Sequence, residues 1–160
     1  ERVVAALAAA GRIGAAHHVT FALEPLNRFE TDILNTTRQG LELVRRVANP
    51  RLGLLLDTFH MAMEEKSIPD AIRAAGPHLV HFQANENDRG FVGTGSIDWP
   101  AVAAAVEAID YQGPITLEPF RRDDQRIAVP LAQWRPPTRD EDPDLAQSAR
   151  YLRALLDRAA

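Results

Sequence analysis

The sequence predicts a parallel α/β fold, in which helices alternate with short apolar strands. Three observations lead to this prediction. Four strand-like segments are separated by single helical segments, no signal of antiparallel strands is present, and no glycine-rich phosphate loop follows a strand. Strands that are joined by one helix run parallel through right-handed crossovers. The pattern fits a (β/α) barrel or a doubly wound sheet, and the missing phosphate loop disfavours nucleotide-binding versions.

In the first half of the chain, helical and strand-like segments alternate twice. Alanine-rich sequence predicts the first helix, and apolar runs that end at a carboxylate predict both strands. A hydroxyl of Thr36 or Thr37 can cap the second helix, and Asn49-Pro50 stops it. The predicted elements are a helix over residues 3–16, a strand over 20–26, a helix from 36 or 37 to 49 and a strand over 52–56.

The second half repeats the pattern. Ser67 can cap a short helix that Gly76-Pro77 ends, and Asp98 can cap the following helix. A long irregular segment is expected before Asp144, and a last helix after it. The predicted elements are the Ser67 helix, a strand over 79–84, a polar loop over 85–96, the Asp98 helix, a strand over 115–117 and the final helix.

Length and composition restrict the function classes. The 160 residues fit a single domain over 1–160 and fall well short of the ~250 residues that a complete eight-unit barrel needs. The net charge of -4 argues against a duplex nucleic-acid binder, and no apolar run reaches the ~20 residues of a membrane helix. The absence of cysteine excludes disulfides and thiolate metal sites. A cytoplasmic location is the default expectation.

Each predicted strand ends in a residue that can coordinate a hard cation. The four residues are Glu24, Asp57, Gln83 and Glu118. Because ligands bind at the carboxyl ends of parallel strands, these side chains are expected to converge. Crowded carboxylates have raised pKa values unless a cation neutralises them. Oxygen ligands alone favour Mg²⁺ or Mn²⁺ over zinc, so one divalent metal ion is expected.

Further polar residues follow the same strand ends, among them Arg28, Glu30, His60 and Arg89. Singly, each has a structural alternative: Asp57 can be a helix cap, and Arg28 can be a salt-bridge partner. Structural roles are expected for four histidines and one tryptophan outside this group. They are His17, His18, His78, His81 and Trp99.

Three motifs resemble a known family. They are Leu23-Glu24-Pro25-Leu26-Asn27-Arg28-Phe29-Glu30, Leu56-Asp57-Thr58-Phe59-His60-Met61 and Leu117-Glu118-Pro119-Phe120. These motifs resemble the C-terminal half of the xylose-isomerase-like TIM-barrel sugar isomerases, in particular the D-tagatose 3-epimerase and D-psicose 3-epimerase family. The resemblance covers most of residues 1–120 and is less clear from Arg121 to Ala160. It implies a (β/α)8 TIM barrel of which this chain holds about the C-terminal four βα units.

The resemblance also implies residue roles. The metal ligands map to Glu24, Asp57, Gln83 and Glu118, and the ion is Mn²⁺, Mg²⁺ or Co²⁺. Gln83 departs from the family, which has histidine at this position. The implied catalytic acid and base are Glu24 and Glu118, on opposite faces of the substrate. The implied substrate-binding residues are Glu30, His60 and Arg89.

The implied activity is ketose 3-epimerisation through a metal-stabilised enediolate. No phosphate-binding element stands out in the sequence, which favours a free sugar as substrate. Gln83 favours one alternative, a hydroxypyruvate-isomerase-like aldose–ketose isomerase. A phosphodiesterase like the endonuclease-IV branch is disfavoured, because that branch uses a histidine-rich zinc site and only five histidines occur here. An alternative of another class is a non-catalytic half-barrel or subunit. Four strands cannot close a barrel, so the chain is expected to need a missing N-terminal half-barrel or to form a homo-oligomer.

Overall fold

The computed structural model describes residues 1–120, 123–133 and 141–157. Among these residues, no helix has both the length and the apolar character needed to cross a membrane. The elements in chain order are α1 (Arg2–His17), β1 (Phe21–Leu23), α2 (Thr37–Val47), β2 (Leu52–Asp57), α3 (Thr58–Glu64), α4 (Ile68–Ala75), a 3-10 turn η1 (Gly76–His78), β3 (Leu79–Ala84), α5 (Trp99–Ala108), β4 (Ile115–Leu117), α6 (Gln125–Ala128) and α7 (Asp142–Asp157).

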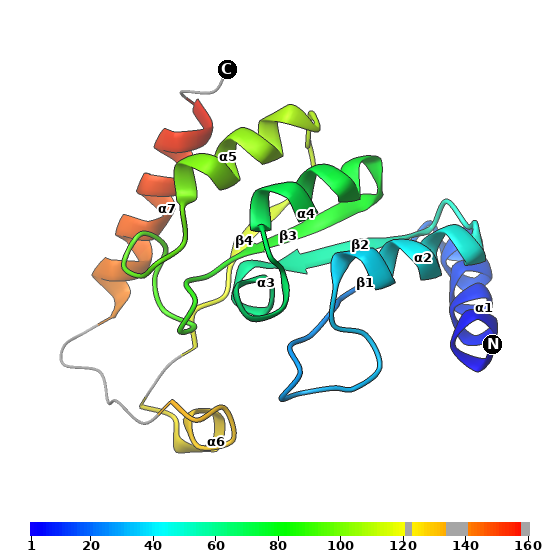
Figure 1. The fold of residues 1–160 in the computed structure, drawn as a ribbon, viewed down its shortest axis with the longest axis horizontal. Coiled ribbons are helices and arrows are strands. Elements are labelled where there is room, and N and C mark those ends of the chain that lie inside the picture. Colours follow the sequence, from blue (N-terminus) through cyan, green and yellow to red (C-terminus); the bar gives the residue numbers. More distant parts are fainter. Residues whose placement is uncertain (121–122, 134–140, 158–160) are drawn as a thin grey trace.

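The four strands form one parallel sheet in the order β1-β2-β3-β4. Helices α1, α2, α4, α5 and α7 form one layer, in which each helix packs against the next (Figure 1). A doubly wound sheet carries helices on both faces. A single helical layer over strands in chain order is instead the wall of a (β/α) barrel. The chain therefore forms four βα units of a TIM barrel, as the sequence predicts.

The hydrophobic core lies between the sheet and the helical layer. Leu54, Leu56 and Phe82 are each at most 1% exposed. Side chains alternate between the two faces of a strand, so Leu55 and His81 lie on the opposite face and are only half-buried. That opposite face corresponds to the barrel interior. Apolar burial is thus concentrated on the helix-covered side of the sheet.

An irregularity in the pairing of β2 with β3 determines which residues face each other at the strand ends. A Cβ at Gly53 would lie 2.4 Å from Val80 Cγ1, so only glycine allows this close approach of the strands. The pairing register shifts directly afterwards, between Leu54 and Leu55. As a result, Asp57 pairs with Gln83. Without this shift its partner would be Phe82, which faces the helices.

The helix caps predicted from the sequence are confirmed. Thr36 Oγ1 accepts the N–H of Gln39 at 3.3 Å, and Gln39 Oε1 accepts the N–H of Thr36 at 3.0 Å, which completes a capping box. Ser67 caps α4, and its Oγ accepts from the Asp70 N–H at 3.3 Å. Asp98 caps α5 in the same way. These polar contacts determine where the helices begin.

Three elements differ from the prediction. The first strand ends at Leu23 and is shorter than the predicted 20–26, since Pro25 has no N–H for a strand ladder. Helix α3 was not predicted. It begins directly after Asp57, whose Oδ1 accepts the N–H of Phe59 at 2.8 Å and caps it. The segment expected to be irregular contains the short helix α6, capped by Asp124.

Candidate active site

Polar residues from all four strand ends lie at the carboxyl edge of the sheet. Glu24 follows β1, Asp57 ends β2, Gln83 lies near the end of β3, and Glu118 follows β4. Asp57 and Gln83 are direct partners across the two central strands. In parallel sheets this edge is where ligands bind.

Glu24, Asp57 and His60 form the tightest group. One potential ligand atom from each residue lies within 4.8 Å of the others, and His60 Nε2 is 3.6 Å from Glu24 Oε1. Helix α3 starts directly after Asp57, so His60 lies one turn further on the same helix face. Asp57 and His60 are at most 2% exposed. The local fold thus buries a carboxylate and an imidazole side by side.

The guanidinium of Arg89 joins the same group. Its Nη1 donates to Asp57 Oδ2 and, at 3.1 Å, to Glu118 Oε2. The guanidinium lies 4.1 Å from the ring centroid of Phe59 and 4.6 Å from that of Phe120. Both rings can bind a cation through their faces. Arg89 therefore supplies the buried acids with a positive charge.

Crowding raises the pKa of two carboxyls. Burial, together with the negative charges of Asp57 and Glu118, raises the pKa of Glu24 to about 7. Burial and the charge of Asp57 also raise the pKa of Glu118. Such a set of acids either binds protons or is neutralised by a cation.

The hydrogen bonds of His60 define its tautomer. Its Nδ1 accepts the backbone N–H of Asn27 at 3.1 Å, and burial lowers the pKa of the ring. A neutral imidazole has one lone pair available, so the ring proton lies on Nε2. Arg89 Nη2 lies 2.9 Å from the same Nε2. His60 thus presents an N–H to the site.

The environment of the Gln83 amide indicates whether these residues fit a metal ion. Its Oε1 is buried and accepts no hydrogen bond within the described part of the chain. A buried acceptor without a partner costs about 1–3 kcal/mol, which a bound cation would offset. Carboxylate and amide oxygens are the donors that Mg²⁺ and Mn²⁺ prefer. The donor set therefore fits a divalent metal ion.

The loop after β1 carries the remaining predicted residues. Asn27 is 2% exposed, and its Nδ2 donates to Glu30 Oε1 at 2.8 Å. Because the backbone N–H of Asn27 donates to His60, Asn27 connects Glu30 with His60. Arg28 forms a bidentate ion pair with Glu64, in which Nε donates to Oε1 at 2.9 Å and Nη2 donates to Oε2 at 3.1 Å. The structural alternative for Arg28 is confirmed, since this pair attaches the loop to α3.

Sequence reasoning missed the residues that support this group. Thr58 and Asn85 are fully buried between the strand ends. Glu86 is also fully buried, and its Oε1 accepts from Trp99 Nε1 at 2.6 Å and from the Gly93 N–H at 2.9 Å. The expected packing role of Trp99 is confirmed. The one available signal was the polar run after β3, because a loop that holds a site must satisfy its own buried polar groups.

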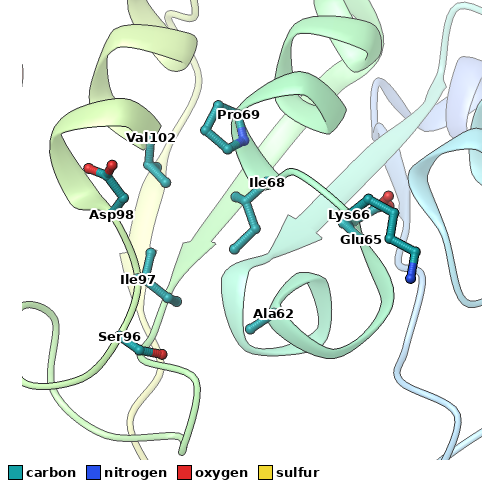
Figure 2. Close-up of a pocket in the computed structure, with 9 residues that line it drawn as sticks. All are labelled: Ala62, Glu65, Lys66, Ile68, Pro69, Ser96, Ile97, Asp98 and Val102. Atoms are coloured by element: carbon teal, nitrogen blue, oxygen red, sulfur yellow. The ribbon is translucent and has the colours of Figure 1, made fainter.

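One cavity of the structure lies away from these residues. It has a volume of about 270 Å³ between α3, α4 and the start of α5 (Figure 2). Ile68, Ile97 and Val102 face one another in it, whereas Glu65 and Lys66 lie at its other side. None of the strand-end residues lines it. It has no part in the chemistry described above.

The chain matches known proteins over most of its length. Residues 1–155 match the family model described as "Xylose isomerase-like TIM barrel". A probable ketose 3-epimerase of Synechocystis sp. is 46% identical over 115 residues, which are 72% of this chain and 40% of that protein. An L-ribulose 3-epimerase of Methylomonas sp. is 40% identical over 133 residues, which are 82% of this chain and 46% of that protein.

Solved structures agree with the sequence matches. The structure of an L-ribulose 3-epimerase superposes with a TM-score of 0.92 at 35% identity, over 99% of this chain and 54% of that one. A D-psicose 3-epimerase from Clostridium cellulolyticum H10, solved with D-tagatose, gives 0.92 at 35% identity, over 98% of this chain and 56% of that one. The chain thus spans about half the length of its relatives.

Proposed function

The chain belongs to the xylose isomerase-like TIM barrel family, and from this premise we propose that the protein carrying it is a divalent-metal-dependent ketose 3-epimerase. The observation that carries the proposal is the group formed by the half-buried Glu24 with the buried Asp57 and His60, to which Arg89 links Glu118. The names of its relatives, a ketose 3-epimerase and an L-ribulose 3-epimerase, support the substrate class.

The proposed metal ligands are Glu24, Asp57, Gln83 and Glu118. Oε1 of Gln83 supports this set, because a cation would provide the partner that the described residues do not. His60 has no free lone pair while Asn27 donates to Nδ1, so its Nε2–H is better suited to a sugar oxygen. The oxygen-rich set favours Mn²⁺ or Mg²⁺, and Co²⁺ is the further candidate.

Epimerisation beside a ketone moves one proton. One of Glu24 and Glu118 removes the proton from C3 as a carboxylate, and the other returns a proton from the opposite face as a carboxylic acid. The pKa of both groups is raised, to about 7 for Glu24, which suits them to take up and release a proton. A bound divalent ion supplies stabilisation of the negative charge that develops on the substrate oxygens.

Three residues are proposed to hold the substrate. His60 donates from Nε2, and Arg89 donates from its guanidinium, which already lies at the carboxylates. Glu30 is exposed beyond Asn27 and is suited to accept a hydrogen bond from a terminal hydroxyl. A sugar is rich in such donors and acceptors and needs no phosphate-binding element.

Gln83 favours a second candidate, a hydroxypyruvate-isomerase-like aldose–ketose isomerase. The two activities use the same type of proton transfer, and they differ in the substrate that fits.

Either activity needs a closed pocket. We propose that residues 1–160 are one domain forming the second half of a barrel, which an N-terminal half-barrel or another copy completes. A half-barrel without catalysis is the alternative if neither is present.

Replacement of the two glutamates tests the proposal. Glu24→Gln and Glu118→Gln are each expected to abolish turnover of a ketose, and the variant that lacks the proton-abstracting carboxylate should also lose exchange of the C3 proton with D₂O; NMR measures both quantities. Glu107→Gln, an exposed carboxylate on α5, is the matched control and should leave both unchanged. A panel of ketoses and short hydroxy-carbonyl acids separates the two candidate activities. Full activity in either glutamine variant would contradict the two-carboxylate mechanism.

A further inference from the structure

Asn85 connects two strand ends inside the proposed site. It follows β3 directly and is fully buried. Its Nδ2 donates to Asp57 Oδ1 at 3.1 Å, and its Oδ1 accepts the backbone N–H of Glu118 at 2.8 Å. One amide therefore bridges the end of β2 and the end of β4.

Thr58 holds Asn85 in this orientation. The Thr58 hydroxyl donates to the backbone carbonyl of Asn85 at 2.6 Å and accepts the Asn85 N–H at 2.8 Å. Thr58 is itself fully buried. Both backbone groups and both side-chain polar atoms of Asn85 are thus engaged, so its amide has a single favourable orientation.

The contact with Asp57 determines which carboxylate oxygen faces the site. Oδ1 accepts from Asn85 and also from the Phe59 N–H at 2.8 Å, which leaves Oδ2 as the oxygen that meets Arg89. A side chain at position 85 needs a donor for Asp57 and an acceptor for Glu118. Among side chains of this size, only the amide of asparagine offers both at neutral pH without charge.

We propose that Asn85 is a positioning residue of the metal site, which orients Asp57 and sets its place relative to Glu118, and that Thr58 positions Asn85. The inference rests on the proposed function for the identity of the ligand, a divalent cation. Hydrogen-bond partners that orient metal ligands typically change metal affinity by about 10- to 100-fold when they are removed.

Titration calorimetry with Mn²⁺ on the protein that carries this chain tests the inference. Asn85→Ala is expected to weaken Mn²⁺ binding about 10- to 100-fold. Thr58→Val is expected to weaken it in the same direction, whereas Thr58→Ser keeps the hydroxyl and should bind like the wild type. Thermal unfolding followed by circular dichroism defines a temperature at which the compared proteins are folded.

Two outcomes overturn the inference. One is an unchanged Mn²⁺ affinity in folded Asn85→Ala. If that variant does not fold, equal affinities of Thr58→Val and Thr58→Ser overturn it instead. A parallel epimerase assay separates the inference from the proposed function. Asn85-dependent Mn²⁺ binding without turnover contradicts only the function, and turnover with Asn85-independent binding contradicts only the inference.

Discussion

The helix-covered side of β2 and β3 and the carboxyl ends of the same strands are both buried, with opposite energetic consequences. Leu54, Leu56 and Phe82 remove apolar surface from water, which stabilises the fold by about 25 cal/mol per Å². Asp57 and Arg89 are buried as deeply, yet desolvating each charge costs several kcal/mol before the pair forms. Burial therefore stabilises the fold at the helix-covered side, whereas at the strand ends it costs stability and brings charged groups together.

The largest expected effect on stability lies on the helix-covered side. Phe82→Ala should lower the free energy of unfolding by about 3–5 kcal/mol, because it opens a cavity in the core. Urea denaturation measures the loss. Leu55→Ala, on the half-buried opposite face, is the matched control and should cost clearly less. Equal losses in both variants would remove the contrast between the two faces.

At the strand ends, the largest effect is expected from Arg89. Arg89→Gln removes the cation between Asp57 and Glu118 and should destabilise the metal-free protein by about 3 kcal/mol. A divalent ion can replace the missing charge, so added Mn²⁺ should restore much of the stability. Added Mn²⁺ should not restore the stability of Phe82→Ala, because an ion cannot fill an apolar cavity. Thermal unfolding with and without Mn²⁺ compares them, and an equal response of both variants to the ion would refute the distinction.

A smaller, pH-dependent effect is expected from Glu24. Its pKa is about 7 in the folded, metal-free protein and has the ordinary value of 4.5 when unfolded. Between these values the unfolded state releases its proton first, so stability should fall as the pH rises from 4.5 to 7. Glu24→Gln cannot titrate and should reduce this slope. Urea titrations across this range in EDTA provide the measurement, and an identical slope in the variant would argue against the raised pKa.

The smallest effect on stability is expected from Gln83. Its Oε1 has no hydrogen-bond partner among the described residues, and removal of this buried acceptor offsets the packing that is lost, so Gln83→Ala should change the free energy of unfolding by less than about 1 kcal/mol. Its affinity for Mn²⁺ should nevertheless fall, whereas Gln83→His should retain a ligand. Calorimetry together with urea denaturation separates the two quantities. A large loss of stability with unchanged affinity would identify Gln83 as structural.

Sequence patterns predicted the fold well because its determinants are local. Capping residues such as Thr36 and Ser67 mark helix starts, and apolar runs mark buried strands. The omission of α3 has a physical reason. Asp57 ends a strand and caps a helix at once, so no loop sequence separates the two elements. The short α6 follows an Asp124 cap, and it was not predicted because it lies within a polar, proline-containing segment.

The strand-end positions of the site were predicted, and their supporting contacts were not. Glu24, Asp57 and Glu118 follow apolar runs, which makes them visible in one sequence. Asn85 bridges residues 28 and 33 positions away, and no local pattern encodes such a contact. The place of Arg89 at the carboxylates likewise depends on a loop conformation with a φ of 61°. Tertiary geometry alone reveals these roles.

The central claim is that the four strand ends hold one divalent ion. Anomalous scattering at the manganese absorption edge, from crystals of the Mn²⁺-loaded protein that carries this chain, tests it most directly. A single strong peak is expected within bonding distance of oxygens from Glu24, Asp57, Gln83 and Glu118. Strand ends that remain without a peak in the presence of Mn²⁺, or a peak bound elsewhere, would contradict it.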